Sequence, residues 1–164
     1  YWSKFPHVYF AGDGARRDAE GNFWFMGRID DVMNVSGHRI STTEVESALV
    51  DHPAVAEAAV CGKLDDMTGQ AIYAFVSLKG TAAGSAEFAD ELRDHVGTKL
   101  GKFTRPKYVT FTAELPKTRS GKIMRRLLRD IAEGRTLGDT TTLADSAIVK
   151  ELQERAKIEV TQDD

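Results

Sequence analysis

The chain has 164 residues and a formal net charge of −3, with 22 Lys and Arg against 25 Asp and Glu. Hydrophobic residues make up 41% and charged residues 29%, which is typical of a globular protein in water. No apolar run approaches the ~20 residues of a membrane span, and no secretory signal opens the chain, so we expect no membrane partner. The single cysteine, Cys61, can form no internal disulfide, which favours the cytoplasm. The four histidines are scattered and have no metal-ligand spacing, so no metal site is predicted.

The start of the chain predicts a β-hairpin. Residues 7–12, HVYFAG, and residues 23–28, FWFMGR, are apolar, and the turn-forming sequence DAEGN lies between them at 18–22. A short apolar stretch follows, in which Ser36 and Gly37 mark a second turn. The sequence opens in mid-pattern and without Met, so we expect it to be a piece of a longer protein.

Helices and strands then alternate up to about residue 133. A helix is predicted from Thr43, which has the spacing of a capping box with Glu46, and Pro53 stops this helix. Apolar periodicity predicts four further elements, which are strands at 54–62 and 70–78, a helix at 86–100 and a strand at 106–112. A last core helix is expected at 123–133, ended by Gly134.

These elements predict an α+β fold, a small mixed-sheet domain with flanking helices. The elements place this domain at about 32–133, after a strand-rich segment. The sequence becomes polar in 135–164, which we interpret as a tail with a short helix at 146–157.

The most distinctive local feature is the basic segment LPKTRSGKIMRR at residues 115–126. Its simplest interpretation is a solvated helix face. Nucleic acid is disfavoured as a partner, because the chain is acidic and no aromatic residues interleave with the cations. A Walker A loop is excluded, since Pro116 replaces the first glycine and Ile123 replaces the Ser or Thr.

Within this segment Lys122 differs from the other cations. It directly follows Gly121, which lets the backbone turn, so a lysine here can project as a point charge toward one anionic oxygen. The neighbouring helix is expected to point three arginines mostly away from its apolar stripe, namely Arg125, Arg126 and Arg129.

Two long motifs, GRIDDVMNVSGHRIS at 27–41 and LPKTRSGKIMRR at 115–126, resemble signature segments of the AMP-forming acyl- and aryl-CoA synthetases, the adenylate-forming enzymes. The sequence GDTTTLAD at 138–145 and His38 are similar to the acetyl-CoA synthetase branch of this family. The resemblance implies a ligase that forms an acetyl-adenylate from acetate and ATP, releases pyrophosphate, and transfers the acetyl group to CoA with release of AMP. It also implies that 1–29 is the end of a large N-terminal domain and that 30–134 is a mobile C-terminal domain, followed by the tail at 135–164.

The same resemblance assigns nucleotide contacts to three residues. Asp13 matches the aspartate that binds the ribose hydroxyls, although it could be a turn residue between glycines. Arg28 matches an arginine near the nucleotide, with a strand-end ion pair as the alternative. Arg39 matches an arginine that reaches a phosphate, with an ordinary surface arginine as the alternative.

Three further roles follow from the resemblance. Lys122 matches the catalytic lysine that bridges the acid carboxylate and the α-phosphate during adenylation, and the family implies reversible acetylation of it by a protein acetyltransferase and deacetylase. Gly37 matches the glycine beside which the pantetheine arm of CoA passes, although it could be a simple turn glycine. Asp30 matches the hinge about which the small domain rotates.

Substrates of the whole enzyme would be ATP and CoA, with Mg²⁺ accompanying ATP outside this segment. The resemblance does not decide which residues hold the CoA phosphates. Relatives often carry a basic residue in the stretch that contains Gly97, Lys99 and Lys102, and any of these three positions could correspond to it. The segment alone is expected to be inactive. A propionyl-CoA or other short-chain acyl-CoA synthetase is an alternative, and a stand-alone binding module with a basic loop is another.

Overall fold

The structure, a computed structural model, describes residues 5–80, 84–137, 140–141, 143–144 and 146–160. It divides the chain into two units, Tyr1–Val32 and Met33–Asp164. No helix within the described part of the chain is long and apolar enough to cross a bilayer.

The first unit contains the predicted hairpin, but its first strand lies later than expected. The strands are β1 (Asp13–Arg17) and β2 (Phe23–Arg28), which pair antiparallel, and the short helix η1 (Ile29–Asp31) follows. The strand predicted at 7–12 is therefore wrong, although the turn at 18–22 is confirmed. The carboxylate of Asp18 closes this turn by accepting hydrogen bonds from Trp24, Asn22 and the backbone of Glu20, which lower its pKa.

The second unit is built on a mixed sheet of five strands, β3 (Val32–Val35), β4 (His38–Ser41), β5 (Val55–Asp65), β6 (Gly69–Leu78) and β7 (Tyr108–Phe111). Their order is β4-β3-β6-β5, and β7 also pairs with β6. β5 and β6 run antiparallel over ten residue pairs, whereas β7 runs parallel to β6. Mixed pairing of this kind confirms the predicted α+β class.

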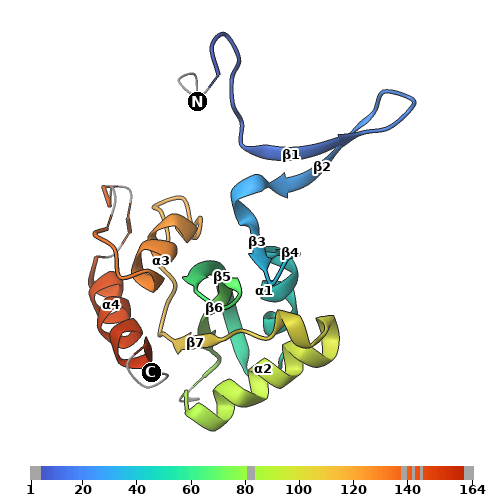
Figure 1. Cartoon of the computed structure of the whole chain (residues 1–164). Coiled ribbons are helices and arrows are strands. Elements are labelled where there is room, and N and C mark those ends of the chain that lie inside the picture. Colours follow the sequence, from blue (N-terminus) through green and yellow to red (C-terminus); the bar gives the residue numbers. More distant parts are fainter. Residues whose placement is uncertain (1–4, 81–83, 138–139, 142, 145, 161–164) are drawn as a thin grey trace. The chain divides into compact units, whose positions relative to one another are not determined.

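Helices cover both faces of the sheet (Figure 1). They are α1 (Thr42–Val50), α2 (Ala86–Leu100), α3 (Arg125–Ala132) and α4 (Ala147–Val160), and η2 (Lys102–Thr104) follows α2. Side chains alternate along β6, so Ile72, Ala74 and Val76 pack with α1 and α2, while Tyr73 and Phe75 pack with α3 and α4. Because both faces are buried, β6 reads as a continuous apolar run.

Two local predictions differ from the structure. Ser41, not Thr43, occupies the N-cap of α1, and it makes no capping hydrogen bond with its side chain. The capping box is therefore wrong, because the Glu46 carboxylate is used elsewhere. The helix at 146–157 was expected in a polar tail, but Val149 and Leu152 of α4 are buried in the same core as α3.

Candidate functional site

Lys122 lies at a tight hydrogen-bonded turn, in which the N–H of Gly121 donates to the carbonyl of Thr118 at 2.8 Å. Lys117 and Ile123 form a β-bridge, and we call residues 117–123 the Lys122 hairpin. The backbone N–H of Thr118 donates to the carbonyl of Lys122 at 2.8 Å, and the N–H of Lys122 donates to Oγ1 of Thr118 at 3.1 Å. Gly121 has φ of +82°, a left-handed conformation that favours glycine. The turn leaves Lys122 exposed, and its ammonium forms no hydrogen bond or ion pair with another described residue.

Two ion pairs hold the base of the Lys122 hairpin. Lys117 Nζ lies 2.7 and 2.8 Å from the two carboxylate oxygens of Glu57 on β5. Just after the hairpin, Arg125 donates through Nε and Nη2 to the two oxygens of Glu46, at 3.0 and 2.6 Å. Glu46 is 8% exposed and also accepts the backbone N–H of Val60 on β5 at 2.9 Å. Both acids therefore connect the hairpin to β5.

A segment near the C-terminus lies along the outer side of the hairpin. Thr118 forms a β-bridge with Leu143, and the N–H of Ala144 donates to the carbonyl of Lys117 at 3.0 Å. The sequence motif at 138–145 is therefore partly explained as a backbone partner of the hairpin, although 138–139, 142 and 145 are outside the described residues.

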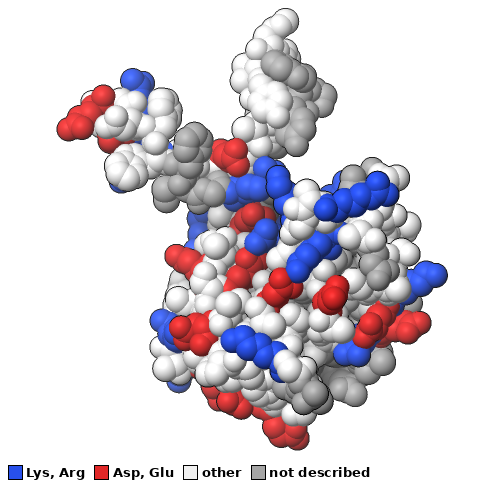
Figure 2. Space-filling model, turned by 180° about the vertical axis from the view of Figure 1, so that it is seen from behind, with Lys and Arg blue, Asp and Glu red and all other residues white. Residues whose placement is uncertain are grey.

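The remaining cations of the basic segment have different environments. Arg125, which was expected to point mostly away from the apolar stripe of its helix, is half-buried and forms the ion pair with Glu46. Arg119 and Arg126 are exposed and contact no other described residue. On the face drawn in Figure 2, Lys and Arg side chains alternate with Asp and Glu side chains instead of forming one basic surface.

Gly37 and Arg39 belong to the β3–β4 hairpin. Ser36 and Gly37 have φ of +50° and +83°, as in the two-residue turns that join antiparallel strands. A Cβ added to Gly37 would meet nothing within 4 Å, so within this chain the glycine is required by the backbone conformation and not by crowding. Arg39 is exposed and has no partner among the described residues, and the ring of His38 stacks on Phe103 at 4.7 Å.

Asp13 and Arg28 come together in the first unit, as cross-strand partners of the β1–β2 hairpin. Arg28 Nη1 lies 3.9 Å from Oδ1 of Asp13 and donates to the carbonyl of Ala11 at 3.4 Å. Because 3.9 Å is too long for a hydrogen bond and Asp13 is 41% exposed, its carboxylate keeps accepting capacity for hydroxyl groups. The backbone of Asp30 lies in η1, and its side chain is outside the described part.

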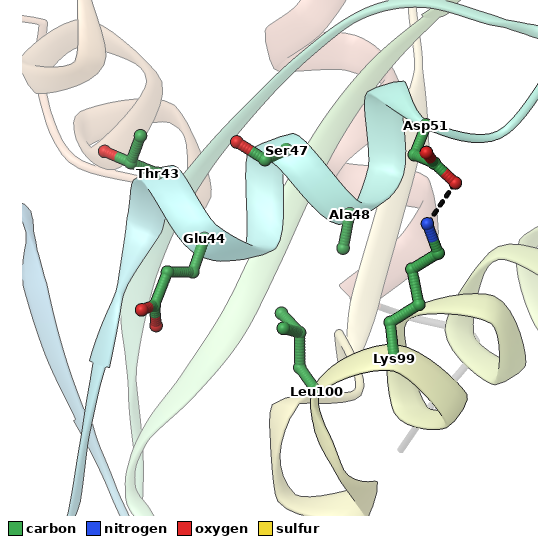
Figure 3. A pocket seen from close by; sticks show the side chains of 7 residues that line it. All are labelled: Thr43, Glu44, Ser47, Ala48, Asp51, Lys99 and Leu100. Carbon is green, nitrogen blue, oxygen red and sulfur yellow. Dashed lines mark hydrogen bonds and ion pairs between the residues drawn. The ribbon is translucent and has the colours of Figure 1, made fainter.

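Of the three positions left open for the CoA phosphates, Lys99 is already paired with Asp51 and lowers the pKa of that carboxyl. Figure 3 shows this pair at one end of a groove of about 370 Å³ between α1 and α2, whose lining includes no other candidate site residue. Lys102 is exposed and contacts no other described residue, and a side chain at Gly97 would collide with Arg105. Lys102 is therefore the candidate that remains available.

The described residues include no group of three or more His, Cys, Asp or Glu that could hold a metal ion. Sequence reasoning also missed Glu46 and Glu57, which fix the Lys122 hairpin. The sequence signal for Glu46 was its position among the apolar residues of a predicted helix, but the capping-box spacing gave another explanation for this glutamate.

Comparison with known proteins identifies the class. Residues 44–122 match the AMP-binding enzyme C-terminal domain family. Over 93% of its length it is 63% identical to acetyl-coenzyme A synthetase of Streptomyces coelicolor, and over 90% it is 61% identical to that of Mycobacterium tuberculosis. It spans about a quarter of these curated relatives, 24% and 23%, and corresponds to their C-terminal part.

Solved structures agree with this assignment. An acyl-CoA synthetase of Brucella canis matches 76% of the chain at 44% identity with a TM-score of 0.62, and the chain covers 24% of it. An anthranilate CoA ligase in complex with anthranoyl-AMP matches 75% at 41% identity with a TM-score of 0.64, again over 24% of its length.

Proposed function

We propose that this chain is the C-terminal domain of an AMP-forming acetate–CoA ligase. The whole protein would convert acetate, ATP and CoA into acetyl-CoA, AMP and pyrophosphate through an acetyl-adenylate. The observation that carries the proposal is the unpaired ammonium of Lys122 directly after the turn of an anchored hairpin, in a chain 63% identical to acetyl-coenzyme A synthetases. Mg²⁺ would accompany ATP and be held by the remainder of the protein.

In the first half-reaction Lys122 would meet the acetate carboxylate and the α-phosphate. Two anions approach each other in this step, and negative charge develops as pyrophosphate leaves. A preorganised cation that is placed at this charge stabilises the transition state more than the separate substrates. Lys122 suits the role because no described acid neutralises it.

Three residues would contact the nucleotide. Asp13 would accept the ribose hydroxyls, with Arg28 nearby, and Arg39 would reach a phosphate. In the second half-reaction the pantetheine arm of CoA would pass Gly37, where an added Cβ finds open space. Between the two half-reactions the small domain would rotate about a hinge, which we place at Asp30, two residues before the first unit ends at Val32.

The test is to assay the half-reactions separately in the full-length protein. Lys122→Ala should lower acetate-dependent pyrophosphate exchange by about a hundredfold or more, the usual cost of losing one transition-state contact. It should largely spare conversion of supplied acetyl-adenylate to acetyl-CoA. Lys79→Ala is the matched control, because Lys79 is also exposed and its side chain contacts no other described residue.

Gly37→Leu should give the reverse pattern, with acetyl transfer lost and pyrophosphate exchange kept. Any side chain at φ of +83° is strained, so Gly37→Ala controls for the backbone. If Lys122→Ala and Gly37→Leu each depress both half-reactions alike, the proposed division of roles is wrong. Comparison of kcat/KM for acetate and for propionate tests which of these acids is the preferred substrate.

A further inference from the structure

The two acids that hold the Lys122 hairpin have no role in the reaction proposed above. We propose that Glu46 is a positioning residue for Lys122, which acts through Arg125, and that Glu57 is a weaker second anchor acting through Lys117. This inference rests on the proposed role of Lys122 and adds the residues that fix where its ammonium lies.

The contacts of Glu46 restrain both the place and the orientation of Arg125. One carboxylate oxygen accepts from Arg125 Nε at 3.0 Å and from the backbone of Val60 at 2.9 Å, and the other accepts from Arg125 Nη2 at 2.6 Å. A bidentate contact between two planar groups permits little rotation. Val60 is itself 1% exposed in the middle of β5, so the carboxylate is tied to a rigid strand.

The restraint reaches Lys122 through a short, hydrogen-bonded stretch of chain. Arg125 follows Lys122 by three residues, which span at most about 11 Å. Between them Ile123 pairs across the hairpin, and the N–H of Met124 donates to the carbonyl of Pro116 at 2.9 Å. Little freedom is left between the two residues, so a shift of the guanidinium moves the backbone that carries the lysine.

The two anchors differ in strength. The Glu46 side chain is 10% exposed and its partner is a planar guanidinium, whereas the Glu57 side chain is 43% exposed and its partner is a compact ammonium. Solvent screens the second pair more, and an ammonium fixes no orientation. Glu46→Gln should therefore affect Lys122 more than Glu57→Gln does.

Positioning makes a different prediction from general stability. A variant that only reduces the fraction of folded molecules lowers the rates of both half-reactions by the same factor. A variant that displaces Lys122 impairs the step in which Lys122 acts and spares the other step. A misplacement of about 1 Å can cost about a hundredfold in rate.

The experiment uses the full-length enzyme and the two half-reaction assays, together with thermal melts. Glu46→Gln keeps the size of the side chain and an acceptor for Val60 but turns an NH2 group toward Arg125. We expect pyrophosphate exchange to fall in kcat by about tenfold or more, with KM for acetate and ATP and the rate of acetyl transfer within about twofold. Glu57→Gln should give a smaller loss of the same kind. Glu151→Gln is the matched control, because it breaks a surface pair with Arg155 on α4.

Equal loss of both half-reactions in Glu46→Gln, or no loss of either, would overturn the inference. If this variant does not fold, Arg125→Lys decides in the same way, because it keeps the charge and loses the bidentate contact. Lys122→Ala in the same assays separates the two proposals. If Lys122→Ala abolishes pyrophosphate exchange but Glu46→Gln and Arg125→Lys do not reduce it, only the positioning role fails. If Lys122→Ala spares pyrophosphate exchange, the proposed function fails.

Discussion

Replacing Leu152 by Ala tests whether α4 belongs to the core of the domain. Leu152 is fully buried against the sheet face that α3 also covers. Removal of a buried leucine side chain costs about 2–5 kcal/mol, so we expect about 3 kcal/mol. Against a total stability of about 5–15 kcal/mol, this is a large fraction.

Urea unfolding of the 164-residue chain measures this loss. With a slope of about 2 kcal/mol per molar urea, the midpoint should fall by about 1.5 M. Both tryptophans, at positions 2 and 24, lie in the first unit, so the transition should be followed by far-UV circular dichroism and not by tryptophan fluorescence. Leu64→Ala is the matched control, because Leu64 is 61% exposed. A midpoint for Leu152→Ala that equals that of Leu64→Ala would refute the packing of α4 in the core.

Three further predictions follow from single residues. The hydrogen bond from Lys107 holds the pKa of Asp65 far below its usual range, so the ionised carboxylate stabilises the fold above about pH 4, and this stabilisation is lost as the pH falls. Asp65→Asn should therefore lower the free energy of unfolding at pH 7 and make that free energy decline less steeply in acid. Urea-unfolding profiles of variant and wild type that run parallel across this pH range would contradict the prediction. Burial raises the pKa of the Cys61 thiol to about 12, so a thiol reagent should modify it far more slowly in the native chain than in urea, and equal rates would show that the site is open. Acetylation of Lys122 in the full-length protein should stop pyrophosphate exchange until a deacetylase removes it, with a change in stability under about 0.5 kcal/mol; mass spectrometry with activity and thermal melts checks this, and a melt that collapses would contradict it.

The local elements were largely predictable from sequence. The strands β5 and β6 and the helix α2 follow from apolar periodicity, which depends only on backbone geometry. The turn before Lys122 was also readable, because Gly121 permits the left-handed conformation that the hairpin uses. The first strand was misplaced because β1, with the sequence DGARR, has no apolar alternation, while the apolar residues before it form no strand.

The partners of charged side chains were decided only by the tertiary structure. Glu46 and Arg125 are 79 residues apart in the chain, and Glu57 and Lys117 are 60 apart, so no local pattern indicates that they meet. The spacing from Thr43 suggested a local capping role for the Glu46 carboxylate, but folding gave it a guanidinium and a strand N–H instead. The packing of α4 is of the same kind, since its amphipathic pattern predicts a helix but not the surface that buries it. Sequence thus determined which cation stands on a turn, whereas the fold determined which acids hold that turn in place.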